Sequence, residues 1–210
     1  MPLTVGFDLD MTLIDPRPGM VRAFEVLEAE TGIPLDGEEF AANLGPPLPT
    51  VFAGYGLDQD TIDALVTRFR VIYPEAVVPA TVDLPGAAEA LAAVRAAGGR
   101  TLVVTGKYAP NAELHLRALG WTVDEVVGEL WSSGKGAALR EHGASIYVGD
   151  HVGDMKGARA AGAVAVGVTT GPCTTDELSV AGADVVLADL TGFPAWLDQH
   201  LSGHRDVAAG

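Results

Sequence analysis

The chain has 210 residues, of which 48% are hydrophobic and 20% are charged, as expected of a globular protein long enough to bury a sizeable core. Its 28 acidic and 13 basic residues give a formal net charge of -15, and no lysine- or arginine-rich run is present, so we expect no nucleic acid and no anionic membrane surface as a partner. The single cysteine, Cys173, excludes an intramolecular disulfide and a cysteine-based zinc site, and the absence of a leader-like start or a long apolar run favours a cytoplasmic protein.

The first predicted element is a short apolar strand, residues 3–7, which leads directly into a cluster of carboxylates. Asp8 and Asp10 follow the strand, with Thr12 and Asp15 shortly after them. Side chains two positions apart in an extended strand point the same way, so we expect Asp8 and Asp10 to lie together. Their mutual repulsion requires a compensating partner, and that partner should indicate the function.

The next segment, residues 16–83, has the spacing of helices. Apolar residues recur at helical intervals in 19–32 and again in 60–73, where Asp60 is placed to cap the start. Between these two stretches, residues 44–56 form a proline- and glycine-rich connection, and no strand pattern is evident. The sequence therefore predicts a helical module inserted after the first strand.

From residue 84 onward, short β-branched runs alternate with helical stretches. The predicted strands are 100–105, 124–128, 145–150, 163–168 and 184–189. The predicted helices are 86–99, 111–120, 135–143 and 154–162, several of them ending at glycine. This alternation predicts an α/β fold, in which residues 1–15 and 84–210 form a parallel sheet flanked by helices.

Carboxylates follow a second predicted strand as well. In "YVGDHVGDM" a strand runs into Gly149, Asp150 comes next, and Asp154 follows four residues later. Ligands of open parallel sheets bind at the carboxyl ends of the strands, so two strands would deliver carboxylates to one edge. A set of oxygen ligands without nitrogen or sulfur favours a hard cation, and Mg²⁺ fits best.

Groups suited to a phosphate lie near the same predicted edge. A third predicted strand, 100–105, ends in Thr105, Gly106 and Lys107, which offer a hydroxyl, a backbone N–H and an ammonium. Lys135 lies at the start of a predicted helix among glycines that allow a ligand to approach closely. Hydroxyl, N–H and lysine are what a phosphate dianion requires, so the combined site indicates phosphoryl transfer.

These motifs resemble those of the haloacid dehalogenase (HAD) superfamily, and specifically its phosphatases with a small helical cap. "DLDMT" (8–12), "VVTGK" (103–107), Lys135 and "GDHVGD" (149–154) occur in the order of that family's four motifs. Residues 82–107, which lead into the second motif and include it, also resemble the corresponding stretch of phosphoglycolate-phosphatase-like members. The resemblance implies a Rossmann-like parallel sheet with an all-helical, C1-type cap domain at 16–83.

The resemblance also implies roles for the carboxylates. Asp8 would be the nucleophile that forms an aspartyl-phosphate, and Asp10 would protonate the leaving alcohol and later deprotonate water. Repulsion from neighbouring carboxylates would raise the pKa of Asp10. The magnesium ligands would be Asp8, the backbone carbonyl of Asp10 and Asp150, with Asp154 acting directly or through water.

The phosphoryl oxygens would be held by Thr105, the N–H of Gly106 and Lys135. Two departures from the family pattern stand out, namely Met11 where many relatives have glycine, and a short interval between Lys135 and Asp150. The second departure leaves open whether Lys107 shares the phosphate contact.

The sequence is compatible with more than one function. The leading function is a Mg²⁺-dependent phosphomonoesterase acting on a small organic phosphate, as a monomer or homodimer. A phosphomutase is disfavoured by Thr12, and a non-catalytic phosphoacceptor module is disfavoured by the long helical insertion. His151 is expected to face solvent, and Tyr55, Arg17 and Arg22 are candidates to face the substrate. The substrate itself stays open.

Overall fold

The structure, a computed structural model, describes residues 3–208 and the side chains of residues 3–203. Its centre is a six-stranded parallel sheet in the order β5-β4-β1-β6-β7-β8. The strands are β1 (Thr4–Phe7), β4 (Arg100–Val104), β5 (Glu125–Val127), β6 (Ile146–Gly149), β7 (Val164–Val168) and β8 (Val185–Leu187). Val5 of β1 lies opposite Thr101 on one side and Ile146 on the other, so the first strand is central. The predicted parallel sheet is confirmed.

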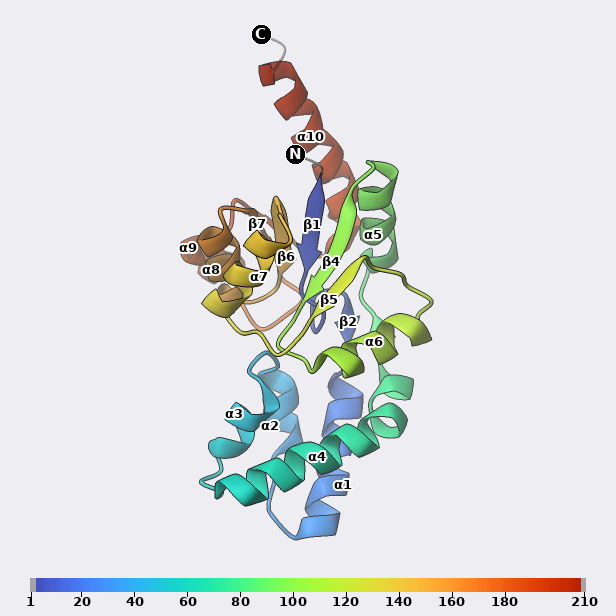
Figure 1. Cartoon of the computed structure of the whole chain (residues 1–210), viewed down its shortest axis with the longest axis vertical. Helices are drawn as coiled ribbons and strands as arrows, with labels where there is room; N and C mark the ends of the chain where they lie inside the picture. Colours follow the sequence, from blue (N-terminus) through green and yellow to red (C-terminus); the bar gives the residue numbers. More distant parts are fainter. Residues whose placement is uncertain (1–2, 209–210) are drawn as a thin grey trace.

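Helices cover both faces of this sheet (Figure 1). One face carries α5 (Ala87–Ala96), α6 (Ala109–Ala118) and α10 (Phe193–Ala208), and the other carries α7 (Ser133–Glu141), α8 (Val152–Ala161) and α9 (Thr175–Ala181). Successive residues of a strand point to opposite faces, which is why Val103 belongs to the first apolar layer and Leu102 to the second. The sheet is therefore buried on both sides, as its continuous apolar strands require.

A helical insertion lies beyond the carboxyl edge of the sheet (Figure 1). It contains α1 (Arg17–Thr31), α2 (Gly37–Ala42), α3 (Leu48–Ala53) and α4 (Gln59–Ala76), followed by the 3-10 turn η1 (Val78–Ala80). These helices have an apolar core of their own, in which Phe24 stacks on Phe40 with ring centroids 4.4 Å apart. The fold class, a parallel α/β sheet with an all-helical inserted cap, is confirmed.

Two short strands join the insertion to the sheet. β2 (Ile14–Asp15) leads into α1 and pairs antiparallel with β3 (Val82–Asp83), through which the chain returns. The 16–83 boundaries of the cap domain remain a prediction.

Several local expectations were wrong. The proline- and glycine-rich connection contains helix α3, which begins after Pro47, because proline is well tolerated in the first turn of a helix. The start of α4 is capped by Asp58, whose carboxylate accepts from the backbone N–H of Thr61, and not by Asp60. Sequence patterns also missed α9, the turn η2 (Leu190–Gly192) and α10. Within residues 3–208 no helix is long and apolar enough to cross a bilayer.

Candidate active site

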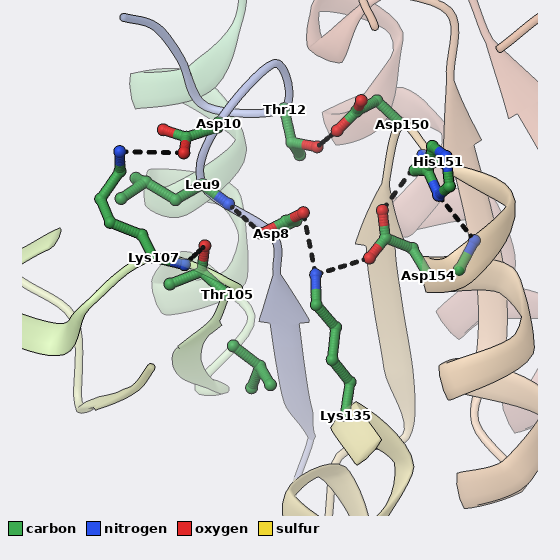
Figure 2. Close-up of polar contacts among 12 residues, drawn as sticks. Asp8, Leu9, Asp10, Thr12, Thr105, Lys107, Lys135, Asp150, His151 and Asp154 are labelled. Atoms are coloured by element: carbon green, nitrogen blue, oxygen red, sulfur yellow. Dashed lines mark hydrogen bonds and ion pairs between the residues drawn. The ribbon is translucent and has the colours of Figure 1, made fainter. Parts of the chain in front are cut away.

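The four predicted carboxylates meet at the carboxyl edge between β1 and β6 (Figure 2). Asp8 and Asp10 follow β1, Asp150 follows β6, and Asp154 lies in the first turn of α8. Asp8, Asp150 and Asp154 are buried, and each can place one oxygen within 4.8 Å of an oxygen of the other two. The carboxylate of Asp10 lies outside this trio and turns toward Lys107.

Lys135 compensates part of the negative charge. Its side chain is fully buried in the first turn of α7, with Nζ 2.9 Å from Oδ2 of Asp8 and 2.7 Å from Oδ1 of Asp154. Burial alone would lower the pKa of Lys135, but the carboxylates of Asp154 and Asp8 outweigh burial and raise this pKa above its ordinary value. Lys135 is thus a permanent cation between two carboxylates.

Asp150 is held in place by a hydrogen bond from a residue that follows β1. The hydroxyl of Thr12 donates to Oδ1 of Asp150 over 2.7 Å. Burial, followed by the charges of Asp154 and Asp8, raises the pKa of Asp150 well above its usual value, and the Thr12 hydrogen bond opposes that rise. Crowded carboxylates that resist ionisation in this way are stabilised when a cation joins them.

The residues present fit a divalent cation. Asp8, Asp10, Asp150 and Asp154 carry four negative charges when ionised, against two positive charges from Lys107 and Lys135, which leaves two negative charges. Hard oxygen ligands of this kind suit Mg²⁺. Both oxygens of Asp154 already accept protein hydrogen bonds, from Lys135 and from the backbone N–H of His151, so any contact from Asp154 to a cation is better made through water.

Asp10 belongs to a second group of polar side chains. Its Oδ2 lies 2.9 Å from Nζ of Lys107, which also donates to the hydroxyl of Tyr73 over 2.6 Å. That hydroxyl lies 2.7 Å from Nε2 of His115. The other oxygen of Asp10, Oδ1, is buried and is the one such side-chain atom in the described part of the chain with no hydrogen-bond partner. Burial raises the pKa of Asp10 against the opposing effect of Lys107, and repulsion from Asp8 adds less than we expected.

The predicted phosphate-binding groups lie at the same edge, after β4. Thr105 is buried, and its hydroxyl accepts from the backbone N–H of Lys107 over 3.2 Å. Gly106 packs so closely against the insertion that a side chain there would clash with the carbonyl oxygen of Gly45. The two lysines bind different carboxylates, because Lys135 contacts Asp8 whereas Lys107 contacts Asp10.

A cavity of about 60 Å³ separates this edge from the helical insertion. Its polar and aromatic lining includes Asp10, Arg70, Tyr73, Lys107, Tyr108 and Asn111, and apolar residues of the insertion form much of the remaining wall. Arg70 stacks over the ring of Tyr108 at 3.7 Å and pairs with Glu129 over 2.7 Å. The cavity therefore offers a confined, largely apolar space directly beside Asp10.

Some residues singled out from the sequence lie elsewhere. Arg17 pairs with Asp15, Arg22 is exposed, and the hydroxyl of Tyr55 accepts from the backbone N–H of Asp36; none of the three lines the cavity. His151 was expected to face solvent but is half-buried and caps α8, with Nδ1 accepting from the backbone N–H of Gly153.

Sequence patterns did not indicate the roles of Tyr73 and His115. Tyr73 belonged to an apolar helical face, and His115 showed no ligand spacing. Met11, in contrast, was singled out correctly, because its φ of 59° lies in the left-handed region that glycine adopts without strain.

Comparisons with known proteins agree with this geometry. The model of the haloacid dehalogenase-like hydrolase family matches residues 5–159, and a second, HAD-hydrolase-like model matches residues 135–193. The protein named "Probable phosphatase IndB" of Dickeya dadantii is 31% identical over 89% of this chain and 89% of its own length. A phosphoglycolate phosphatase of Caulobacter vibrioides is 30% identical over 91% of this chain and 89% of its own. The crystal structure of a predicted phosphatase from Clostridium acetobutylicum shares the fold, with a TM-score of 0.80, 22% identity, and coverage of 95% of this chain and 99% of that one.

Proposed function

This chain belongs to the haloacid dehalogenase-like hydrolase family and is a hydrolase of phosphatase type, and from that premise we propose that it is a Mg²⁺-dependent phosphomonoesterase acting through an aspartyl-phosphate. The observation that carries the proposal is the trio Asp8, Asp150 and Asp154 around Lys135, at the sheet edge that faces the cavity. Three buried carboxylates at one point are costly unless a cation and an incoming ligand use them.

The residues divide the chemistry between them. Asp8 attacks phosphorus, and Lys135, Thr105 and the N–H of Gly106 hold the phosphoryl oxygens while charge redistributes. Asp10 gives a proton to the leaving oxygen and afterwards takes one from the water that hydrolyses the aspartyl-phosphate. Bound Mg²⁺, held by Asp8, the backbone carbonyl of Asp10 and Asp150, would neutralise charge on the phosphoryl group.

The cavity supports a small substrate. Its volume of about 60 Å³ is far below the ~300–1,000 Å³ of pockets that take drug-sized ligands, so we propose a leaving group well below that size. Relatives named phosphoglycolate phosphatase make small phosphorylated acids the first compounds to test. The residues lining the wall would set this selectivity.

The test is hydrolysis by the purified chain of a panel of metabolite phosphates and of p-nitrophenyl phosphate, with Mg²⁺ and with EDTA. We expect turnover only with the metal, and loss of turnover in Asp8→Asn, which keeps the shape of the nucleophile but removes its charge. Full activity of Asp8→Asn, or of the wild-type chain in EDTA, would refute the proposal.

A further inference from the structure

The two oxygens of Asp10 are in different environments. Oδ2 is fixed by the ammonium of Lys107 at 2.9 Å, whereas Oδ1 is buried, has no partner, and belongs to a residue that lines the cavity. A buried oxygen without a hydrogen-bond partner destabilises the folded chain, so its persistence calls for an explanation. A ligand in the cavity that shares a proton with Oδ1 would supply one.

Lys107 is itself held in place by residues from two elements. Its side chain is only 4% exposed, and Nζ reaches both Asp10 and the hydroxyl of Tyr73, which comes from α4 of the insertion. The Tyr73 hydroxyl accepts from Lys107, so its own proton is directed to Nε2 of His115 on α6. Burial and then the nearby charge of Lys107 lower the pKa of His115 to about 3, which leaves that nitrogen unprotonated and able to accept.

The hydrogen bonds run in one direction, with Lys107 donating to Tyr73 and Tyr73 donating to His115. Lysine can only donate, neutral His115 accepts at Nε2, and Tyr73 does both, so no member can turn around without losing a buried hydrogen bond. The hydrogen bond to Tyr73 therefore holds the ammonium of Lys107 beside Oδ2 of Asp10. We refer to Lys107, Tyr73 and His115 as the Asp10 support.

We infer that the Asp10 support fixes Oδ2 of Asp10 so that Oδ1 is the atom that exchanges the proton with the leaving group. Lys107, Tyr73 and His115 are positioning residues in this scheme, since none of them has a hydrogen bond to Oδ1. The inference rests on the proposed function, because it assigns an atom to the acid–base step of that reaction.

In the proposed first step the phosphoryl group passes from the leaving oxygen to Asp8, and Asp10 supplies one proton. A carboxylate oxygen of Asp8 forms a bond to phosphorus, and the bond from phosphorus to the leaving oxygen breaks. The electron pair of that bond goes to the leaving oxygen, which takes the proton from Oδ1 of Asp10. Asp10 is left as a carboxylate whose Oδ2 faces the ammonium of Lys107, so the charge produced is stabilised where it forms.

Protonation matters most when the leaving group is a poor one, and this provides the test. An aliphatic alcohol needs the proton, whereas p-nitrophenolate leaves without it. We would measure kcat/KM for phosphoglycolate, glycerol 1-phosphate and p-nitrophenyl phosphate with Tyr73→Phe and Lys107→Met, using Asp10→Asn as the reference. Tyr55→Phe is the matched control, because it removes a tyrosine hydroxyl from the same insertion but outside the cavity.

We expect Tyr73→Phe and Lys107→Met to reduce kcat/KM for the aliphatic phosphates about 10- to 100-fold, and for p-nitrophenyl phosphate less than about threefold. Tyr55→Phe should leave all three values unchanged. Equal losses on both kinds of ester, in variants with wild-type circular dichroism, would overturn the inference, as would a wild-type chain that hydrolyses only the aryl ester. If the wild-type chain hydrolyses none of the compounds with Mg²⁺, the proposed function fails instead.

Discussion

The hydroxyl of Thr12 donates to Oδ1 of Asp150 over 2.7 Å, although the two residues are 138 positions apart. Thr12 follows β1 and Asp150 follows β6, which are neighbours in the sheet. This bond fixes the direction in which Asp150 presents its other oxygen.

We therefore expect Thr12→Val, which keeps the shape of the side chain but removes the donor, to weaken Mg²⁺ activation. The apparent Mg²⁺ constant should rise about 10-fold, in line with the usual cost of losing a partner of a metal ligand. The measurement is the rate as a function of Mg²⁺ concentration. Thr12→Ser retains the hydroxyl and should stay near the wild-type constant; an unchanged constant in Thr12→Val would contradict the expected role.

Lys135 is expected to matter for stability as well as for turnover. Lys135→Met leaves the carboxylates of Asp8 and Asp154 buried without their shared cation, and breaking a buried pair in this way costs about 3–5 kcal/mol. We expect a lower free energy of unfolding in EDTA, no detectable hydrolysis, and a larger stabilisation by Mg²⁺ than in the wild-type chain, measured by urea denaturation.

The matched control for this variant is Lys156→Met, which removes an exposed lysine from α8. It should match the wild-type chain in both conditions. A Lys135→Met protein as stable in EDTA as the wild type would show that the two carboxylates do not depend on the lysine.

His115 predicts a pH dependence of stability. The pKa of His115 is about 3 in the folded chain because of burial, against about 6.5 unfolded, so the unfolded chain takes up the proton first as the pH falls. The contribution of His115 is thus complete above pH ~6.5 and decreases by about 2 kcal/mol between pH 7.5 and pH 5.0. His115→Gln, which can still accept from Tyr73, should lack this decrease.

The free energy of unfolding of both proteins, measured by urea denaturation across this pH range, tests the expectation. Groups with raised pKa values, such as Asp10 and Asp150, act in the opposite direction but are common to both chains, so the difference between the curves isolates His115. His142→Gln serves as a control from outside the support. Parallel curves for the wild type and His115→Gln would contradict the prediction.

Gly106 is expected to tolerate no side chain. Gly106→Ala places a methyl group against the carbonyl oxygen of Gly45, so the 44–47 segment of the insertion must move away from the sheet edge. We expect at least a 10-fold lower kcat/KM with only a modest drop in Tm, because the clash lies at the rim of the cavity and not in a core. Gly134→Ala, where an added methyl group meets open space, is the control.

The sequence predicted those parts of the molecule that depend on local pattern. The β-branched runs located the sheet. The positions of three aspartates just after strand ends, and of Asp154 in the first turn of the next helix, were sufficient to bring all four to one edge. Helix α3 was missed because its first turn is built on prolines that also signal turns.

Contacts between distant elements could not be predicted in the same way. Tyr73 and His115 are 42 residues apart on helices that share no motif, and the packing of α4 against α6 brings them together. The same holds for the division of the two lysines, since nothing in the spacing of Lys107 and Lys135 indicates which carboxylate each will bind.

The pairing of β2 with β3 has a consequence for how the gene could be edited. Because Ile14 lies opposite Asp83 and Asp15 opposite Val82, the chain leaves the sheet and returns to it at almost the same point. A two-residue Asn-Gly turn joining Asp15 to Val82 would continue the existing antiparallel ladder as a hairpin. A shortened polypeptide of this design would retain every strand of the sheet while removing Tyr73, and so would offer a minimal scaffold onto which other lids could be grafted.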